Sequence, residues 1–156
     1  MSNFTDVSYL NSVFGNPRGQ QDAPDWKKAS KQLHLIQEEL AELVEGIENH
    51  DVQEVRDAIA DVLVTTYGMA HILGIDADED MAAVQASNLS KLCKTTSEVE
   101  ETIRFYEQEK GLQVYSGGEL PEAYIKSACD QTGSDGKFYP AHKFLKSINW
   151  HEPKFR

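Results

Sequence analysis

Two long stretches of helical periodicity, separated by a short turn, constrain this sequence more than any other feature. In residues 26–47 the apolar positions recur every three or four residues, at Leu33, Ile36, Leu40, Leu43 and Ile47. Residues 52–73 form the second stretch, and Gly74 follows it as a helix-terminating glycine. Because a short turn makes consecutive helices pack antiparallel, the two stretches predict a helical hairpin.

Capping signals place the remaining helices. Asp25 precedes the first long helix, and Asp51 with Glu54 has the spacing of a capping box before the second. Shorter helices are predicted over residues 5–14 and 78–92. Ser97 and Glu100 predict a capping box that opens a fifth helix, which ends before Gly111.

The residue composition and pattern of the sequence change after Gly111. Short β-branched and aromatic pieces such as "LQVYSGG" and "KFLKS" are separated by Gly, Pro and "GSDG". These pieces predict a small β appendage rather than a second domain. The expected architecture is an all-α bundle of about five helices with a short C-terminal β-hairpin-like extension. We expect a single domain, 1–156, in which 1–24 form a helix and loop, 25–110 the helical bundle and 111–156 the extension.

Composition excludes several classes of protein. The 156 residues carry a formal net charge of −11, which argues against binding to the phosphate backbone of nucleic acid. The two cysteines have no metal-ligand spacing, and the N-terminus has no signal-peptide pattern. No apolar run approaches the roughly 20 residues that span a bilayer. We therefore expect a cytoplasmic protein that binds neither membrane nor nucleic acid.

Carboxylates are concentrated in both long helices. "EELAE" supplies Glu38, Glu39 and Glu42 to the first, and Asp57 and Asp61 lie four residues apart in the second. Taken alone, the first group fits an ordinary solvated acidic face. The sequence around Asp61 is apolar in nearly every direction, which predicts a buried helix. An ionised carboxylate there would cost roughly several kcal/mol unless it is paired or binds metal.

Antiparallel packing can bring the two carboxylate groups opposite each other. Convergent carboxylates with no surplus of basic partners do not stay charged and close without a cation. Ligand sets made only of oxygen select Mg²⁺, with Mn²⁺ as a substitute. The predicted ligands are Glu38, Glu39, Glu42, Asp57 and Asp61.

A phosphate group bound beside such a metal also needs positive donors. Asn88 and Lys91 lie three residues apart on one helix, and Lys94 and Arg104 follow them. These four are the candidate substrate-binding residues. The lysines of the tail, Lys137, Lys143 and Lys146, are read as ordinary surface lysines.

Together these residues resemble the all-α nucleoside triphosphate pyrophosphohydrolases, which include MazG-like proteins, phosphoribosyl-ATP pyrophosphohydrolases and all-α dUTPases. The family pattern is EExxE on one helix, ExxD on the next, and a later helix bearing Lys or Asn. "EELAE" matches the first part, Asp61 followed by "VLV" matches the Asp of the second, and "NLSK" is similar to the third. The family's Glu three residues before the Asp falls on Ala58, and the acidic residue stands at Asp57 instead. The resemblance covers roughly residues 26–94, and "SDGKFYPAHKFLKS" looks like an extension found in phage-type members.

The resemblance implies a Mg²⁺-dependent MazG-like enzyme that converts a nucleoside triphosphate to its monophosphate and pyrophosphate. It implies catalytic roles for Glu38 or Glu39 as the base and for Lys91 on the departing pyrophosphate. The substrate is open: a deoxynucleotide such as dGTP or another purine nucleotide, phosphoribosyl-ATP and dUTP all fall within the family. Family members also imply a homo-dimer or homo-tetramer, located in the host cytoplasm if the chain is phage-encoded.

Three other functions can be compared with the same residues. The pair His50–Asp51 matches a metal-binding "HD" signature, but it falls in a predicted turn. A di-iron bundle needs Glu-x-x-His, and no glutamate here has a histidine three residues later. The remaining alternative is a non-enzymatic helical oligomer or adaptor whose acidic face provides solubility.

Overall fold

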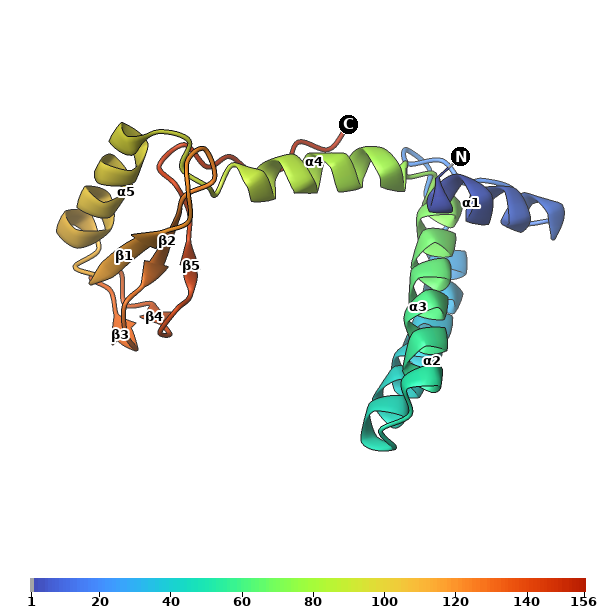
Figure 1. Cartoon of the computed structure of the whole chain (residues 1–156). Coiled ribbons are helices and arrows are strands. Elements are labelled where there is room, and N and C mark those ends of the chain that lie inside the picture. Colours follow the sequence, from blue (N-terminus) through green and yellow to red (C-terminus); the bar gives the residue numbers. More distant parts are fainter. Residues whose placement is uncertain (1) are drawn as a thin grey trace. The chain divides into compact units, whose positions relative to one another are not determined.

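The computed structural model describes residues 2–156, and the chain divides into two compact units, Met1–Met81 and Ala82–Arg156 (Figure 1). The first unit contains α1 (Asn3–Val13), α2 (Trp26–Glu48) and α3 (Val52–Leu73). Helix α4 (Ala77–Leu89) begins in the first unit and ends in the second, which also holds α5 (Thr96–Glu109) and the strands. Helices with a small C-terminal strand region confirm the predicted fold class.

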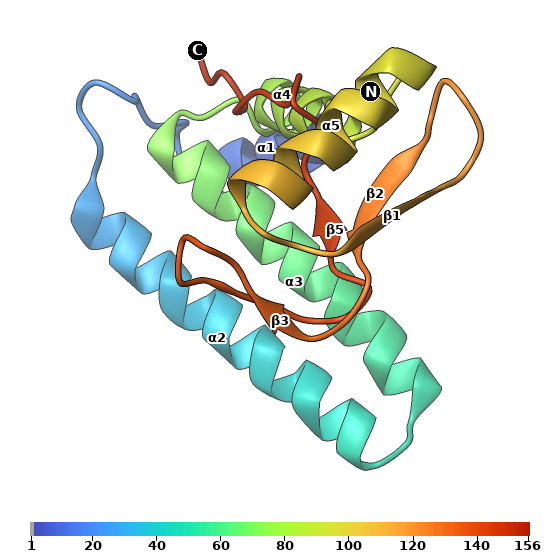
Figure 2. The ribbon, with the colours of Figure 1, turned by 90° about the vertical axis from the view of Figure 1, so that its left-hand side faces the viewer.

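Helices α2 and α3 form the predicted antiparallel hairpin, side by side in both ribbon views (Figures 1 and 2). The Asp25 carboxylate caps α2 by accepting from the Lys28 N–H at 3.0 Å. The Asp51 carboxylate caps α3, accepting from the N–H groups of Gln53 and Glu54. Gly74 ends α3 in the left-handed conformation, as predicted for a helix-terminating glycine.

Helix α1 is attached to α3 by a buried histidine. The His71 ring is fully buried, with Nδ1 2.8 Å from the Ser8 hydroxyl and Nε2 2.8 Å from the Asn16 carbonyl. Because both ring nitrogens have partners, this histidine satisfies its polar groups inside the protein. The Phe4 and Tyr67 rings add an aromatic contact with centroids 6.0 Å apart.

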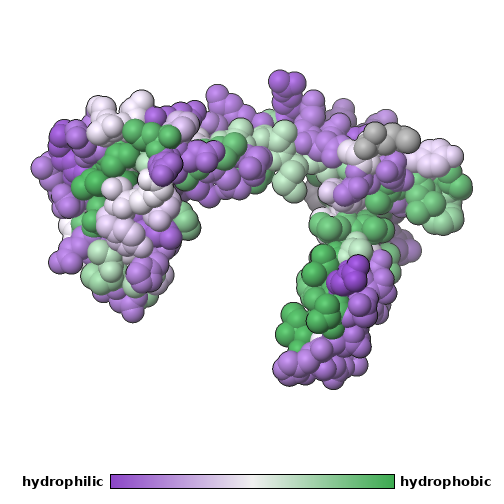
Figure 3. All heavy atoms as spheres, in the orientation of Figure 1, coloured by the Kyte–Doolittle hydropathy of each residue, from purple (hydrophilic) through white to green (hydrophobic). Residues whose placement is uncertain are grey.

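Within the first unit, α3 is not buried all round, whereas its apolar sequence predicts burial on every side. Ile59 and Leu63 are each 48% exposed, and Val64 is also exposed. A two-helix hairpin covers one face of each helix, so an apolar outward face stays uncovered. Figure 3 shows green, hydrophobic side chains along this hairpin.

The second unit packs α5 against a three-stranded antiparallel sheet. Its strand order is β1 (Val114–Gly117), β2 (Tyr124–Ser127) and β5 (Phe144–Leu145). A separate two-stranded sheet pairs β3 (Gln131–Thr132) with β4 (Phe138–Tyr139). The core of this unit consists of Cys93, Tyr106, Leu112, Ala123, Ile125 and Leu145. The extension therefore contains more strands than the predicted hairpin.

Two predicted helix bounds in this part of the chain are corrected. Helix α4 ends at Leu89 rather than residue 92, because residues 90–92 form a turn. The cap of α5 is Thr95, whose hydroxyl accepts from the Glu98 N–H at 3.2 Å, and not Ser97. The Ser97 hydroxyl instead donates to the Glu101 carboxylate. Both pairs have the same spacing, and an extended backbone at Thr95 decides between them.

Across residues 2–156, no single helix is long and apolar enough to cross a membrane. Helices α3 and α4, which are bent relative to each other, meet the length and composition of a membrane span only when they are taken together.

Candidate functional site

Two contacts fix the register of the α2–α3 hairpin. Near one end, the Gln32 side chain donates to the Thr65 carbonyl at 2.9 Å. Near the other, Gly46 lies against Val55, where an added Cβ would approach Val55 atoms to 3.1 Å. Interpolation between these contacts sets Glu39 level with Ala60, the neighbour of Asp61, and Glu42 level with Ala58, the neighbour of Asp57.

The four positions Gln32, Glu39, Glu42 and Gly46 follow the three-to-four-residue spacing of one helix face. Gln32 and Gly46, at the ends of this series, both contact α3. Glu39 and Glu42 therefore belong to the face of α2 that is turned toward α3. Glu39 and Asp61 are half-buried, whereas Glu38, Glu42 and Asp57 are exposed.

The pKa of Glu39 responds to the other four predicted carboxylates. Partial burial, and then the charges of Glu42, Asp61, Glu38 and Asp57, raise the pKa of Glu39 above its usual value. Two of these four charges come from α3, so the groups predicted on separate helices share one electrostatic environment.

Basic side chains do not neutralise this group. Within residues 2–156, the ion pairs found are Lys28–Asp25 and Lys110–Asp135, and neither involves the five carboxylates. Across the same residues, no three His, Cys, Asp or Glu side chains converge closely enough to hold a metal as they stand. The donor set still fits a hard cation, because it consists of carboxylate oxygens in mutual repulsion.

The family's second-helix glutamate position is occupied by a buried alanine. Ala58 is 2% exposed, and Asp57, one residue earlier, is exposed. The position three residues before Asp61 therefore points into the protein but carries no oxygen ligand. Of the four carboxylates that raise the pKa of Glu39, Asp57 has the smallest effect.

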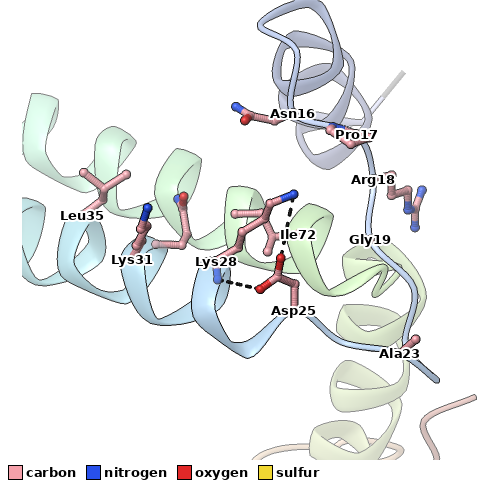
Figure 4. Close-up of a pocket in the computed structure, with 11 residues that line it drawn as sticks. Asn16, Pro17, Arg18, Gly19, Ala23, Asp25, Lys28, Lys31, Leu35 and Ile72 are labelled. Carbon is pink, nitrogen blue, oxygen red and sulfur yellow. Dashed lines mark hydrogen bonds and ion pairs between the residues drawn. The ribbon is translucent and has the colours of Figure 1, made fainter.

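A pocket of about 370 Å³ lies beside the first half of α2 (Figure 4). Its walls come from the loop that precedes α2, from α2 itself and from the end of α3. The lining residues are Asn16, Pro17, Arg18, Gly19, Ala23, Asp25, Lys28, Lys31, Gln32, Leu35 and Ile72.

The pocket continues along α2 from the carboxylates. Leu35 lies four residues before Glu39, and Lys28, Gln32 and Leu35 continue the same helix face. Three cationic side chains, Arg18, Lys28 and Lys31, line it. The Lys28 ammonium is 3.9 Å from the Asp25 carboxylate, a contact drawn in Figure 4. The pocket thus combines positive charge with the apolar Leu35 and Ile72, next to a negative cluster.

Close backbone contact shapes this pocket. The Gly19 N–H donates to the His71 carbonyl at 2.9 Å. An added Cβ on Gly19 would lie 1.8 Å from the Ile72 carbonyl oxygen, so only glycine fits there. The sequence prediction did not include this pocket. The signal that was available was the spacing of Lys28 and Lys31 upstream of "EELAE".

The predicted substrate-binding residues lie in the second unit. The Lys91 ammonium donates to the Asn88 side-chain oxygen at 2.7 Å, so the predicted pair is formed. Lys94 and Arg104 are exposed. Contact between these residues and a phosphate group stays a prediction.

The "HD" pair has a structural role. His50 adopts a left-handed conformation in the turn between α2 and α3. Its ring Nδ1 lies 3.1 Å from the Glu48 carbonyl, while Asp51 caps α3. Turn and cap account for both residues.

Comparison with known proteins identifies the family of the chain. The family model for phosphoribosyl-ATP pyrophosphohydrolase matches residues 7–88, which include all five carboxylates and Asn88. The chain belongs to this family. Its membership confirms the predicted relationship to the all-α pyrophosphohydrolases. The match ends before Lys91, Lys94 and Arg104.

One relative extends the comparison to viruses. An uncharacterised protein of Acanthamoeba polyphaga mimivirus is 32% identical over 84 residues. The match covers 49% of this chain and 33% of the viral protein, so the chain spans about a third of that relative's length.

Proposed function

We propose that the chain is a divalent-metal-dependent nucleotide pyrophosphohydrolase. The observation that carries this proposal is the interaction of Glu39 with four other carboxylates from two helices, with no basic residue paired to them in residues 2–156. Family membership gives the reaction class. The substrate is a nucleoside triphosphate, of which a purine deoxynucleotide such as dGTP is one candidate.

The metal ligands in this proposal are Glu38, Glu39, Glu42, Asp57 and Asp61. A bound Mg²⁺ would neutralise phosphate charge and make a nearby water more acidic. Closure around the ion requires the side chains to turn toward it, which exposed Glu38, Glu42 and Asp57 are free to do. Asp57 is the weakest of the five, since Ala58 occupies the inward position.

The reaction splits the anhydride between the α- and β-phosphates. A water oxygen forms a bond to phosphorus as the anhydride P–O bond breaks, releasing the monophosphate and pyrophosphate. Glu38 or Glu39 accepts a proton from the water. The pKa of Glu39 is raised above that of an ordinary carboxylate, which makes Glu39 the stronger base. A role on the departing pyrophosphate for Lys91, which donates to Asn88, stays an expectation from the family resemblance.

The pocket beside α2 is the place we propose for the rest of the substrate. Arg18, Lys28 and Lys31 supply positive charge, while Leu35 and Ile72 offer apolar surface. A nucleotide carries both kinds of group.

The uncovered apolar face of the hairpin supports a homo-oligomer. Exposed apolar side chains occur on both helices, at Leu33, Leu35, Leu40, Val44, Ile47, Val52, Ile59, Leu63 and Val64. Exposed apolar surface on this scale is typical of association sites. We propose that a second copy of the chain covers it, in a dimer or a tetramer.

Pyrophosphate release tests the proposed reaction. The chain is incubated with a panel of nucleoside triphosphates and Mg²⁺, with and without chelator. We expect chelator-sensitive pyrophosphate, and we expect Asp61→Asn to lose this turnover. Glu45→Gln changes an exposed carboxylate of α2 that is outside the proposed ligand set; it is the control and should keep the turnover. Release of orthophosphate, or full activity in Asp61→Asn, would overturn the proposal.

A further inference from the structure

The two parts of the sequence on either side of Gly111 differ in charge. Residues 1–110 carry nine Lys and Arg against 21 Asp and Glu, whereas residues 111–156 carry six against five. The acidity of the protein therefore resides in the helical part. Anions are not repelled by the β-containing part as they are by the rest.

A pocket of about 510 Å³ lies within the second unit, a size typical of small-molecule sites. It is lined by Tyr106 of α5, by β4, by β5 and by residues beside them. The lining residues are Tyr106, Lys137, Phe138, Tyr139, Lys143, Phe144, Leu145 and Lys146.

The interior of this pocket is fixed by buried groups. Leu145 is buried, as is Tyr106, whose hydroxyl donates to the Lys146 carbonyl at 3.0 Å. The Lys146 N–H lies 3.1 Å from the same hydroxyl oxygen. These contacts hold β5 against α5, so the pocket is preformed.

Three lysines at this pocket have no carboxylate partner in the part of the chain that the structure describes: Lys137, Lys143 and Lys146. The nearby carboxylate, Asp135, is already engaged. It accepts from the Tyr139 hydroxyl at 2.8 Å and from the Lys137 N–H at 3.0 Å, and it pairs with Lys110 at 3.5 Å. The pocket therefore has a net positive charge.

Aromatic rings stand beside these lysines. Phe138 is 60% exposed and Phe144 57% exposed, although both are large apolar side chains. The Lys143 ammonium is 5.4 Å from the Tyr139 ring centroid, and the Lys146 ammonium is 3.1 Å from that of Trp150. Exposed rings next to uncompensated ammonium groups match a ligand with a flat apolar ring and a negative group.

We propose that this pocket binds a free nucleotide, with the phosphate on Lys137 and Lys143 and the base against Phe138, since the Lys126 ammonium already lies 4.3 Å from the Phe144 ring centroid. The site lies entirely within the second unit and shares no residue with the carboxylate group of α2 and α3. It does not depend on the proposed hydrolysis. It gives the β-containing extension a ligand-binding role that the family match over residues 7–88 does not cover.

Calorimetric titration of the full chain with a nucleoside monophosphate tests this site. Chelator is present throughout, so that binding is measured without metal or turnover. We expect Lys137→Gln/Lys143→Gln to weaken binding about tenfold or more, since each lysine supplies a charge-assisted contact. Both side chains are on the surface, and their loss leaves the buried contacts of Tyr106 intact.

Two control variants locate the binding. Lys154→Gln removes a lysine of the same unit that lines a different pocket, and it should leave the affinity unchanged. Lys28→Gln/Lys31→Gln alters the pocket beside α2. If this second variant abolishes binding while Lys137→Gln/Lys143→Gln does not, the nucleotide occupies the other pocket and the proposal is overturned.

Further titrants define the ligand. Binding of the nucleotide tighter than that of inorganic phosphate or of the uncharged nucleoside supports a site that recognises both parts. Equal binding of phosphate and nucleotide would overturn a role for the rings. Binding of a short single-stranded oligonucleotide but not of the mononucleotide would replace the free nucleotide by nucleic acid and also overturn the proposal.

Discussion

At the scale of single residues, Glu39 is the group on which the site depends. It is half-buried, it belongs to the α2 face turned toward α3, and four neighbouring carboxylates act on it. In an unliganded chain that repulsion opposes folding. A divalent ion at the proposed site would reverse the sign of the local field.

This repulsion should lower the free energy of unfolding of the metal-free protein at neutral pH. The folded chain holds the Glu39 proton more tightly than the unfolded chain, whose pKa is the ordinary 4.5. The penalty is therefore absent below pH 4.5, where both states are protonated, and complete above the raised folded-state pKa. We expect metal-free Glu39→Gln to be more stable than wild type at neutral pH and equal to it below pH 4.5, as measured by urea denaturation. A less stable variant at neutral pH would contradict this.

The same substitution should lower catalysis if Glu39 is the base. Loss of a general base typically lowers kcat about 10²–10⁴-fold. The measurement is the rate of pyrophosphate release by Glu39→Gln at saturating Mg²⁺. An unchanged kcat would assign the base to Glu38.

Gly19 shows how a single residue shapes the pocket beside α2. Gly19→Ala places a Cβ 1.8 Å from the Ile72 carbonyl oxygen, and backbone on both sides leaves little room to adjust. We expect a loss of about 1–3 kcal/mol in the free energy of unfolding, as is typical of overpacking. Urea denaturation measures it, with the neighbouring exposed Gln20→Ala as control. Equal stability of the two variants would show that the loop moves away freely.

At the scale of elements, the helices could be predicted far better than the strands. The bounds of α2 and α3 follow from Asp25, Asp51 and Gly74, because caps are local signals that lie next to the residues they affect. The strands of the second unit are two to four residues long, and β2 pairs with β5, which begins 17 residues after β2 ends. Such pairing depends on distant contacts, which local periodicity does not contain.

The candidate site was predictable to a similar degree. The five carboxylates could be proposed as one group because their spacing matches the period of a helix, and their role as ligands stays a prediction. The pocket was missed because Arg18 and Gly19 come from a loop, whose path depends on contacts with the end of α3. Burial of α3 was overestimated, since an apolar helix sequence does not say which of its faces a partner within the same chain covers.

A buried carboxylate joins α5 to the last residues of the chain. Glu98 accepts a short hydrogen bond from the Ser147 hydroxyl and one from the Lys94 N–H at 2.8 Å. Burial opposes ionisation, but these hydrogen bonds outweigh it and lower the pKa of Glu98 below its usual value. The stabilisation is therefore complete above the unfolded-state pKa of 4.5 and lost as the pH falls through the folded-state value.

Replacing Glu98 should consequently weaken the second unit at neutral pH. Glu98→Gln removes charge-assisted hydrogen bonds, for which we expect a loss of about 1.5–3 kcal/mol. Thermal denaturation at neutral pH, compared with the exposed Glu100→Gln on the same helix, measures the difference. Identical melting of the two variants would show that these hydrogen bonds contribute nothing net.

At the scale of the whole molecule, the exposed face of the hairpin predicts self-association. Leu40 and Leu63 are 45% and 48% exposed, on α2 and α3 respectively. Burying one leucine contributes about 1.5–3 kcal/mol to the free energy of association. The double variant Leu40→Asp/Leu63→Asp should therefore raise the dissociation constant of the oligomer at least about 100-fold. Sedimentation equilibrium measures it, and Phe14→Asp, an exposed apolar residue on the C-cap of α1, is the control. A monomeric wild-type chain would contradict the proposed oligomer.

Mn²⁺ binding followed by electron paramagnetic resonance measures whether carboxylates of α2 and α3 share one divalent ion. We predict saturable binding by the wild-type chain and at least about a tenfold loss of affinity in both Glu42→Gln and Asp61→Asn, one variant from each helix. Glu45→Gln should bind as the wild type does. Equal affinity in all four proteins would show that no ion bridges the two helices.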